Sequence, residues 1–210
     1  MSRINWLILD AMGVIFSQED DLREVFLPHF EKQAFSFGNG NIRQIIESIY
    51  LHLTLGEIDS GQFFNFLNIA QPDLGFLLQV TLDPNFTDFV RQVKKSQQIA
   101  VLSNDSQEWA NFRNHQLGLR TLVKHYVTSS LLGARKPDRK AYVKMCWLLE
   151  AKPQDCTYVD NLESNLGPAK ELGMRVILFR RQGKINSSYP VVGSFLELQQ
   201  MISDGEKNHE

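Results

Sequence analysis

Hydrophobic positions follow two patterns along the chain, and together they predict its strands and helices. Short runs of consecutive apolar residues are typical of strands that are buried on both faces. They predict strands at Ile4–Leu9, Ile99–Leu102, Tyr126–Ser130, Thr157–Val159 and Arg175–Phe179. Apolar residues at helical spacing predict helices at Phe86–Ser96, between Asp105 and Gly118, from Pro137 to about Glu150, at Leu162–Leu172 and at Phe195–Ile202. This alternation predicts an α/β fold with a doubly wound parallel sheet.

One long segment has helical spacing and no strand pattern. It runs from about residue 20 to residue 79, and Asp59 with Gln62 forms the pattern of a capping box at the start of a helix. The segment therefore predicts an all-helical insert between the first strand and the rest of the sheet. We expect its phenylalanines to pack in the core of the insert: Phe26, Phe30, Phe63, Phe64 and Phe66.

Several polar residues mark the ends of the predicted helices. Asp105 with Glu108 is expected to cap the helix after the second strand, and Gly118 is expected to end it. Pro137 is expected in the first turn of its helix, where proline is favoured. Gly173 is expected to end the helix before the last predicted strand.

Polar side chains also stand where the predicted strands end. Asp10, Ser103–Asn104 and Asp160 each follow a strand directly, and Lys136 lies in the loop after another strand. In open parallel sheets, ligands bind at the carboxyl ends of the strands. We therefore expect two acids, a hydroxyl, an amide and a lysine to converge on one edge of the sheet.

Composition narrows the classes of function. The chain has 210 residues, of which 43% are hydrophobic and 22% charged, and its formal net charge is −2. Such a balance is ordinary for a globular protein with a core, and the charge predicts neither nucleic acid nor a membrane as partner. Cys146 and Cys156 form no C-x-x-C pair, and reduced thiols in a cytoplasmic protein are the expected state. The oligomeric state stays open.

Four motifs give the chain a family resemblance. They are Leu7–Val14, Val101–Asn104, Lys136–Pro137, and Tyr158–Asn161, the last of which continues through Asn165 to Gly173–Met174. In this order and separation, they resemble the motifs of the haloacid dehalogenase-like hydrolases over nearly the full length. The insert is similar to the small helical cap of the type I members. The resemblance implies a Rossmann-like core at 1–16 and 84–210 and a cap domain at 17–83.

The resemblance also implies a chemistry in which a carboxylate attacks the substrate. Asp10 would be the nucleophile and form a covalent intermediate that water then cleaves. Ser103, Asn104 and Lys136 would be catalytic and would bind the transferring group, while Asn161 and Asn165 would order the loop after the fourth strand. A magnesium ion would be held by Asp10, the backbone carbonyl of Met12 and Asp160.

The sequence departs from this pattern at Met12. Phosphatases of the family usually have a second aspartate there, which protonates the leaving oxygen, and a thioether has no such proton. Asp10-Ala11-Met12-Gly13-Val14 resembles instead the first motif of 2-haloacid dehalogenases, whose halide product needs no proton, whereas Asp160 resembles the metal-binding members. We expect a magnesium-dependent hydrolase of small phosphorylated compounds, with an activity weakened by the loss of the second aspartate. The alternatives are a carbon–halide hydrolase and a non-catalytic member that binds a ligand or partner.

Overall fold

A six-stranded parallel sheet forms the centre of the described part of the chain, in the order β3-β2-β1-β4-β5-β6. The structure is a computed structural model, and it describes residues 5–32, 41–70, 72–94, 96–182 and 186–207. The strands are β1 (Trp6–Leu9), β2 (Gln98–Ser103), β3 (His125–Thr128), β4 (Cys156–Asp160), β5 (Arg175–Phe179) and β6 (Val191–Val192). The predicted fold class is confirmed, and the strand order reverses at β1, as it does in a doubly wound sheet.

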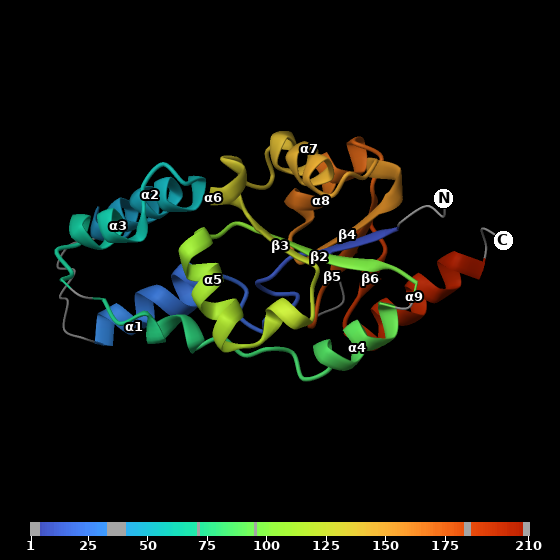
Figure 1. Ribbon diagram of the computed structural model, residues 1–210, viewed down its shortest axis with the longest axis horizontal. Helices are drawn as coiled ribbons and strands as arrows, with labels where there is room; N and C mark the ends of the chain where they lie inside the picture. Colours follow the sequence, from blue (N-terminus) through green and yellow to red (C-terminus); the bar gives the residue numbers. More distant parts are fainter. Residues whose placement is uncertain (1–4, 33–40, 71, 95, 183–185, 208–210) are drawn as a thin grey trace.

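Helices connect the strands and cover both faces of the sheet (Figure 1). The α-helices are α1 (Leu27–Lys32), α2 (Asn41–Leu55), α3 (Ser60–Phe66), α4 (Phe86–Val93), α5 (Gln107–Gln116), α6 (Ser129–Leu132), α7 (Arg139–Leu148), α8 (Glu163–Glu171) and α9 (Phe195–Lys207). Shorter helical turns are η1 (Leu22–Phe26), η2 (Leu74–Leu78), η3 (Leu119–Thr121) and η4 (Pro153–Asp155). None of the helices in the described residues is long and apolar enough to cross a membrane.

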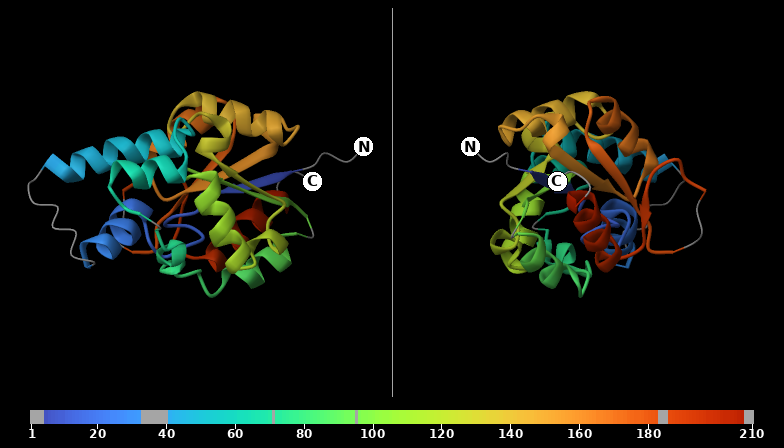
Figure 2. Two further views of the ribbon diagram at one scale, coloured as in Figure 1. Left: turned by 60° about the vertical axis from the view of Figure 1, so that its left-hand side comes forward. Right: turned by 90° about the vertical axis from the view of Figure 1, so that its right-hand side faces the viewer.

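Alternate residues of the strands pack into two separate hydrophobic cores, one on each face of the sheet. In β1, Leu7 and Leu9 pack with residues of α4, α5, α9 and the insert, while Trp6 and Ile8 pack with residues of α6, α7 and α8. Figure 2 shows the two layers, with yellow and orange helices above the sheet and green and red helices below. This double burial explains why the strands read as continuous apolar runs in the sequence.

The segments that enter and leave the insert lie side by side. Phe16 forms a bridge with Leu82, the Ser17 amide donates to the Thr81 carbonyl at 2.9 Å, and the Asp83 amide donates to the Ile15 carbonyl at 2.9 Å. These pairs stand at the predicted boundaries of the core and the cap. The division into 1–16 with 84–210 and 17–83 remains a prediction.

The insert has an aromatic core, as its helical pattern predicts. Phe26, Phe30, Phe63 and Phe64 are buried, whereas Phe66 is 63% exposed, so that prediction is wrong for Phe66. Trp109 from α5 completes the cluster, with its ring stacked on Phe26 at a centroid distance of 5.9 Å. Its indole nitrogen donates to the Ser60 hydroxyl at 2.8 Å, which joins α3 of the insert to α5 of the sheet layer. The capping box of Asp59 and Gln62 is confirmed.

Two predicted helix starts are wrong. The helix α5 has Ser106 as its N-cap rather than Asp105, because the Asp105 carboxylate turns inward to pair with the fully buried Arg113. Glu108 instead accepts the Ser60 amide at 2.9 Å. In α7, the N-cap is Asp138, whose carboxylate accepts the Lys140 amide at 2.9 Å, so Pro137 lies before the helix.

Other differences concern element ends. The third strand stops at Thr128, and Ser129–Leu132 forms α6, because the Thr128 hydroxyl accepts the Leu131 amide and caps a helix there. The strand β6, only two residues long, was absent from the prediction. Gly118 and Gly173 follow their helices in left-handed backbone conformations, with φ of 67° and 96°, which confirms both as helix ends. The residue Ile4 of the first predicted strand lies outside the described residues.

Candidate active site

The predicted polar residues meet at the carboxyl edge of the sheet. Asp10, Ser103 and Asp160 follow or end β1, β2 and β4, which are neighbours in the sheet. A cavity of about 390 Å³ opens at this edge. Of the eight residues predicted for the site, seven line the cavity: Asp10, Met12, Ser103, Asn104, Lys136, Asn161 and Asn165. The eighth, Asp160, is fully buried behind them.

Lys136 connects the two acids of the site. Its ammonium nitrogen donates to Asp10 Oδ1 at 2.6 Å and to Asp160 Oδ2 at 3.0 Å. All three side chains are largely buried, with exposed fractions of 2% for Lys136, 10% for Asp10 and 0% for Asp160. One cation thus bridges two carboxylates in a place with little water, where charge pairs interact strongly.

Asn104 holds the backbone that presents this lysine. Its side-chain nitrogen donates to the Lys136 carbonyl at 2.9 Å, and its side-chain oxygen accepts the Lys136 amide at 2.8 Å. The amide of one strand end therefore fixes a loop that follows a different strand. This geometry accounts for an asparagine at position 104, because it needs both a donor and an acceptor on one side chain.

Asp160 is surrounded by hydrogen-bond donors. Its Oδ1 accepts the Leu162 amide at 2.8 Å and Asn165 Nδ2 at 3.1 Å. Its Oδ2 accepts Lys136 Nζ, Asn165 Nδ2 at 3.1 Å and the Tyr158 hydroxyl. Asn165 thus orients Asp160, and Asp160 orients Lys136.

The buried charges shift the pKa values of the site. Burial, followed by repulsion from Asp160, raises the pKa of Asp10 to about 7, and the Lys136 ammonium limits this rise. Burial of Lys136 lowers its pKa, but Asp10 and Asp160 raise it by more, so the pKa of Lys136 lies above its usual value. Lys136 is therefore a cation across the neutral range, and it stabilises the carboxylate form of Asp10.

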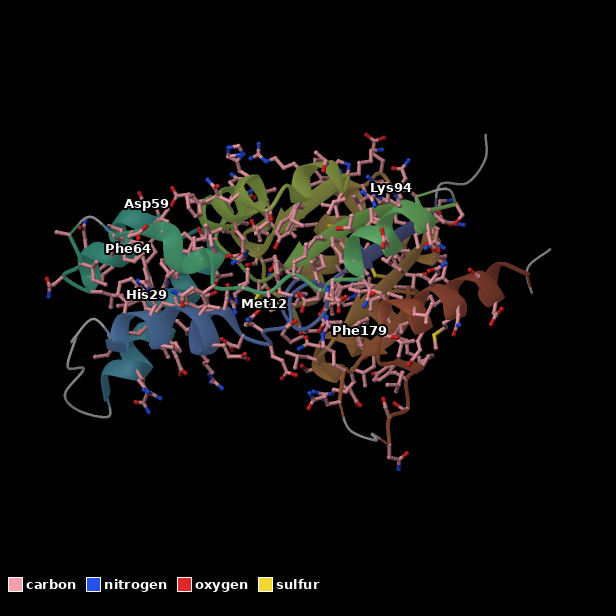
Figure 3. The ribbon with its side chains drawn as sticks, turned by 90° about the horizontal axis from the view of Figure 1, so that it is seen from below. Met12, His29, Asp59, Phe64, Lys94 and Phe179 are labelled. Carbon is pink, nitrogen blue, oxygen red and sulfur yellow. The ribbon has the colours of Figure 1, made fainter. Side chains whose placement is uncertain are left out.

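Met12 and Asn161 face the same cavity beside Asp10. Met12 is 7% exposed, and Figure 3 places it between the helices of the insert and the sheet. Asn161 is 3% exposed, and its Nδ2 finds no hydrogen-bond partner among the described residues. Gly13, at a φ of 77°, lies directly against it, since a Cβ there would be 2.2 Å from Asn161 Nδ2. Only glycine leaves room for the Asn161 side chain.

Some residues of the site were absent from the sequence prediction. Arg135 lines the cavity, and its guanidinium also donates to the Thr54 hydroxyl in α2, so one loop reaches both the site and the insert. Tyr158 contacts Asp160 from two positions earlier in β4, on the same face of the strand. That spacing was the available signal for Tyr158. For Arg135, the signal was its place next to Lys136.

The insert supplies one wall of the cavity. Asp21 and Tyr50 both line it, and the Tyr50 hydroxyl donates to Asp21 Oδ1. Burial and then the charge of Asp105 raise the pKa of Asp21 to about 7. Asp21 is thus a second carboxyl group of this cavity that changes its charge near neutral pH.

The donors of the site decide whether a divalent metal fits. Magnesium prefers about six oxygen ligands in a near-octahedral arrangement. The described residues contain no group of three or more His, Cys, Asp or Glu side chains placed to hold a metal ion. A carboxylate has about four lone-pair sites, and the carboxylate of Asp160 already accepts from four donor groups: Lys136 Nζ, the Tyr158 hydroxyl, the Leu162 amide and Asn165 Nδ2. The hydrogen bonds of Asp160 therefore do not fit the metal role that the sequence predicts for it.

Comparison with known proteins places the chain in a family. The sequence profile of the haloacid dehalogenase-like hydrolases matches residues 4–173. Over 71 residues, the chain is 31% identical to flavin mononucleotide hydrolase 1 of Arabidopsis thaliana, a match that covers 34% of this chain and 29% of that protein. The chain thus spans less than a third of this relative.

Solved structures with a similar fold include members with different activities. A HAD family enzyme of Bacteroides thetaiotaomicron, a mutant in complex with magnesium and inorganic phosphate, has a TM-score of 0.70 at 17% identity, covering 87% of this chain and 97% of that one. An L-2-haloacid dehalogenase of Xanthobacter autotrophicus, with chloropropionic acid covalently bound, has a TM-score of 0.66 at 14% identity, covering 95% and 98%. At these identities, the likeness shows the fold alone. The profile match over most of the sequence shows that the chain belongs to the haloacid dehalogenase-like hydrolases.

Proposed function

We propose that this chain hydrolyses a small phosphorylated compound, with Asp10 as the attacking nucleophile. The observation that carries the proposal is the contact of Lys136 with Asp10, at 2.6 Å, inside a cavity that also contains Ser103 and Arg135. A carboxylate attacks only in its ionised form, and the ammonium stabilises that form against burial. The same ammonium and the Arg135 guanidinium offer positive charge to an anionic substrate.

The two oxygens of Asp10 have different surroundings. Oδ1 accepts the Ala11 amide at 2.7 Å and Lys136 Nζ, whereas Oδ2 accepts no hydrogen bond from the described residues. We assign the attack to Oδ2, since its lone pairs are free to meet the substrate. The new bond joins Oδ2 to phosphorus, and the bond from phosphorus to the leaving oxygen breaks, with the electron pair on that oxygen. Water then forms a bond to phosphorus, the bond from phosphorus to Oδ2 breaks with its electron pair on the carboxylate, and the proton lost by the water passes to solvent or to the released oxygen.

The leaving group determines how fast the first step is. The side chain of Met12 has no proton to give, and a positioned general acid contributes typically about 10²–10⁴-fold in rate. A substrate whose leaving oxygen is stable as an anion loses little by this. We therefore place the preferred substrates among activated phosphates, such as aryl and acyl phosphates, rather than simple alkyl esters.

The relatives support the proposal from outside the chain. One is a hydrolase of flavin mononucleotide, and one solved relative is in complex with inorganic phosphate. Both agree with a phosphoryl group as the part of the substrate that the site recognises. The insert forms the other wall of the cavity, so we expect its residues to select the rest of the substrate.

The test is phosphate release from an aryl phosphate by the purified chain. We expect release by the wild type and none by Asp10→Asn, which keeps the shape of the side chain but removes its nucleophilic charge. Lys140→Met, a change at an exposed residue of α7, is the matched control and retains the activity. Release that persists in Asp10→Asn would refute the proposal. Absence of release from the wild type would leave the non-catalytic alternative and hydrolysis of a carbon–halide bond.

A second candidate is hydrolysis of a carbon–halide bond. Met12 favours it, because a halide leaves without a proton, and so do the hydrogen bonds of Asp160, which leave no free oxygen for a metal. The expected product is halide ion released from a 2-haloacid without any added metal. Halide release together with no phosphate release would favour this candidate over the first.

A further inference from the structure

We propose that the site acts without a divalent metal ion, with the Lys136 ammonium supplying the positive charge between its two carboxylates. This inference rests on the proposed function and says how that chemistry is supported. It also runs against the metal that the sequence predicts. Its basis is the set of contacts made by Asp160, Asp10 and Asn161.

The carboxylate of Asp160 has no free lone pair for a metal. Five hydrogen bonds reach its two oxygens, and its side chain is fully buried. Two of the five come from Asn165 and one from the Leu162 amide, both of which are fixed parts of the loop and helix after β4. A metal at Asp160 would have to displace buried donors, each of which would then lie unpaired at a cost in free energy.

The carboxylate of Asp10 has one oxygen without a hydrogen bond from the described residues. Oδ1 is held by the Ala11 amide and Lys136, so only Oδ2 faces the cavity without a hydrogen bond from the described residues. The proposed attack uses that oxygen. Among the carboxylates at the strand ends, the site thus offers a metal one unshared oxygen, and a magnesium ion there would have to take the rest of its six oxygen ligands from water, backbone or substrate.

Asn161 follows Asp160 in the sequence and lines the cavity together with Asp10. It is neutral, 3% exposed, and its Nδ2 hydrogen atoms have no acceptor among the described residues. A buried donor without an acceptor is costly, and an anionic oxygen in the cavity would satisfy it. Asn161 therefore favours an anion at the place where a metal ligand would need a carboxylate.

The test begins with the wild type after treatment with EDTA and dialysis. We expect phosphate release from an aryl phosphate to differ by less than about twofold between EDTA and millimolar Mg²⁺. We also expect no saturable heat of binding when Mg²⁺ alone is titrated into the protein. Activity that is lost in EDTA and restored by Mg²⁺, or saturable Mg²⁺ binding that Asp10→Asn abolishes, would overturn the inference.

A variant with an added carboxylate tests whether the lack of acidic ligands is what keeps Mg²⁺ from binding. Asn161→Asp adds a carboxylate to the cavity lining directly after the end of β4, so we expect saturable Mg²⁺ binding to appear in the titration. Ser164→Asp adds the same charge at an exposed position of α8 outside the cavity, and it should not bind. A folded Asn161→Asp variant that fails to bind Mg²⁺ would count against position 161 as the missing ligand. If that variant does not fold, the wild-type titration still decides.

Failure of the proposed phosphate hydrolysis and failure of the metal-free site give different results. If the wild type releases no phosphate under any condition, the proposed function fails, whereas the absence of Mg²⁺ binding still supports a site without metal. If phosphate release depends on Mg²⁺, the proposed function stands and the inference falls.

Discussion

Replacing Lys136 by methionine tests the arrangement of charges at the site. Methionine has a similar length and no charge, so the variant keeps most of the packing and removes the ammonium between Asp10 and Asp160. Breaking a buried ion pair by removing one partner typically costs about 3–5 kcal/mol of stability, because a charge is left buried and unpaired. Here two carboxylates lose their shared partner, so we expect a loss in this range at about pH 8.

The loss depends on pH in a direction that follows from Asp10. Its pKa is about 7 in the folded state, against 3.8 for the ordinary side chain, so the folded state binds more protons between these values. Stability contributed by this group therefore falls as pH rises through that window. Without the ammonium, the folded pKa of Asp10 rises further. We expect Lys136→Met to lose more stability relative to wild type at about pH 8 than at about pH 5.

The assay is urea unfolding of both proteins across that pH range, followed by circular dichroism. Lys140→Met is the control, because it removes the same charge from an exposed position of the adjacent helix. It should change stability by less than about 0.5 kcal/mol at either pH. Equal stability of Lys136→Met and wild type at both pH values would refute the account of Lys136 as the partner of two buried carboxylates.

Three further predictions follow from the same structure. Met12→Asp adds an acid to the cavity and should raise the rate of phosphate release from an alkyl phosphate by about 10²-fold or more, whereas Met12→Leu should not change it. If a folded Met12→Asp variant is no faster than the wild type, the site lacks more than the acid. Asp21→Asn removes a carboxyl group whose pKa is raised to about 7, so in urea unfolding we expect the variant to be more stable than the wild type by about 1–3 kcal/mol at about pH 8 and by little at about pH 4. A change in stability that is the same at both pH values would contradict this. Gly56→Ala would place a Cβ 2.5 Å from the Ser130 carbonyl oxygen, whereas Gly118, at a similar φ, has open space around it, so in thermal unfolding we expect Gly56→Ala to lose about 1–3 kcal/mol more stability than Gly118→Ala. Equal losses of stability would show that this contact does not join the insert to the sheet layer.

The sequence predicted those parts of the structure that depend on local pattern. Strand β5 was predicted with its observed bounds, because the apolar run Val176–Phe179 follows Arg175 shortly after a helix-ending glycine. Asp10 was placed at a strand end for the same reason. The two residues of β6 carry too short a pattern to be distinguished from a loop, and they pair with β5 only after the chain has folded.

Long-range pairing explains what the sequence did not predict. Asp105 has the spacing of a capping residue, yet its carboxylate pairs with Arg113, and both side chains are fully buried. The surroundings of Asp160 were equally hidden, because Lys136 reaches it from a loop 24 positions away in the chain. A carboxylate at the end of a strand is the same letter in the sequence whether it binds a metal or a lysine, and only the contacts tell the two apart.

Mass spectrometry of the reaction shows whether Asp10 forms a covalent bond to the substrate. The chain is mixed with an aryl phosphate, quenched in acid during turnover and digested, and the peptide that contains Asp10 is analysed. We expect a phosphoryl group on Asp10 in the wild type and none in Asp10→Asn. Phosphate release with Asp10 unmodified throughout, or with the phosphoryl group on another residue, would contradict it.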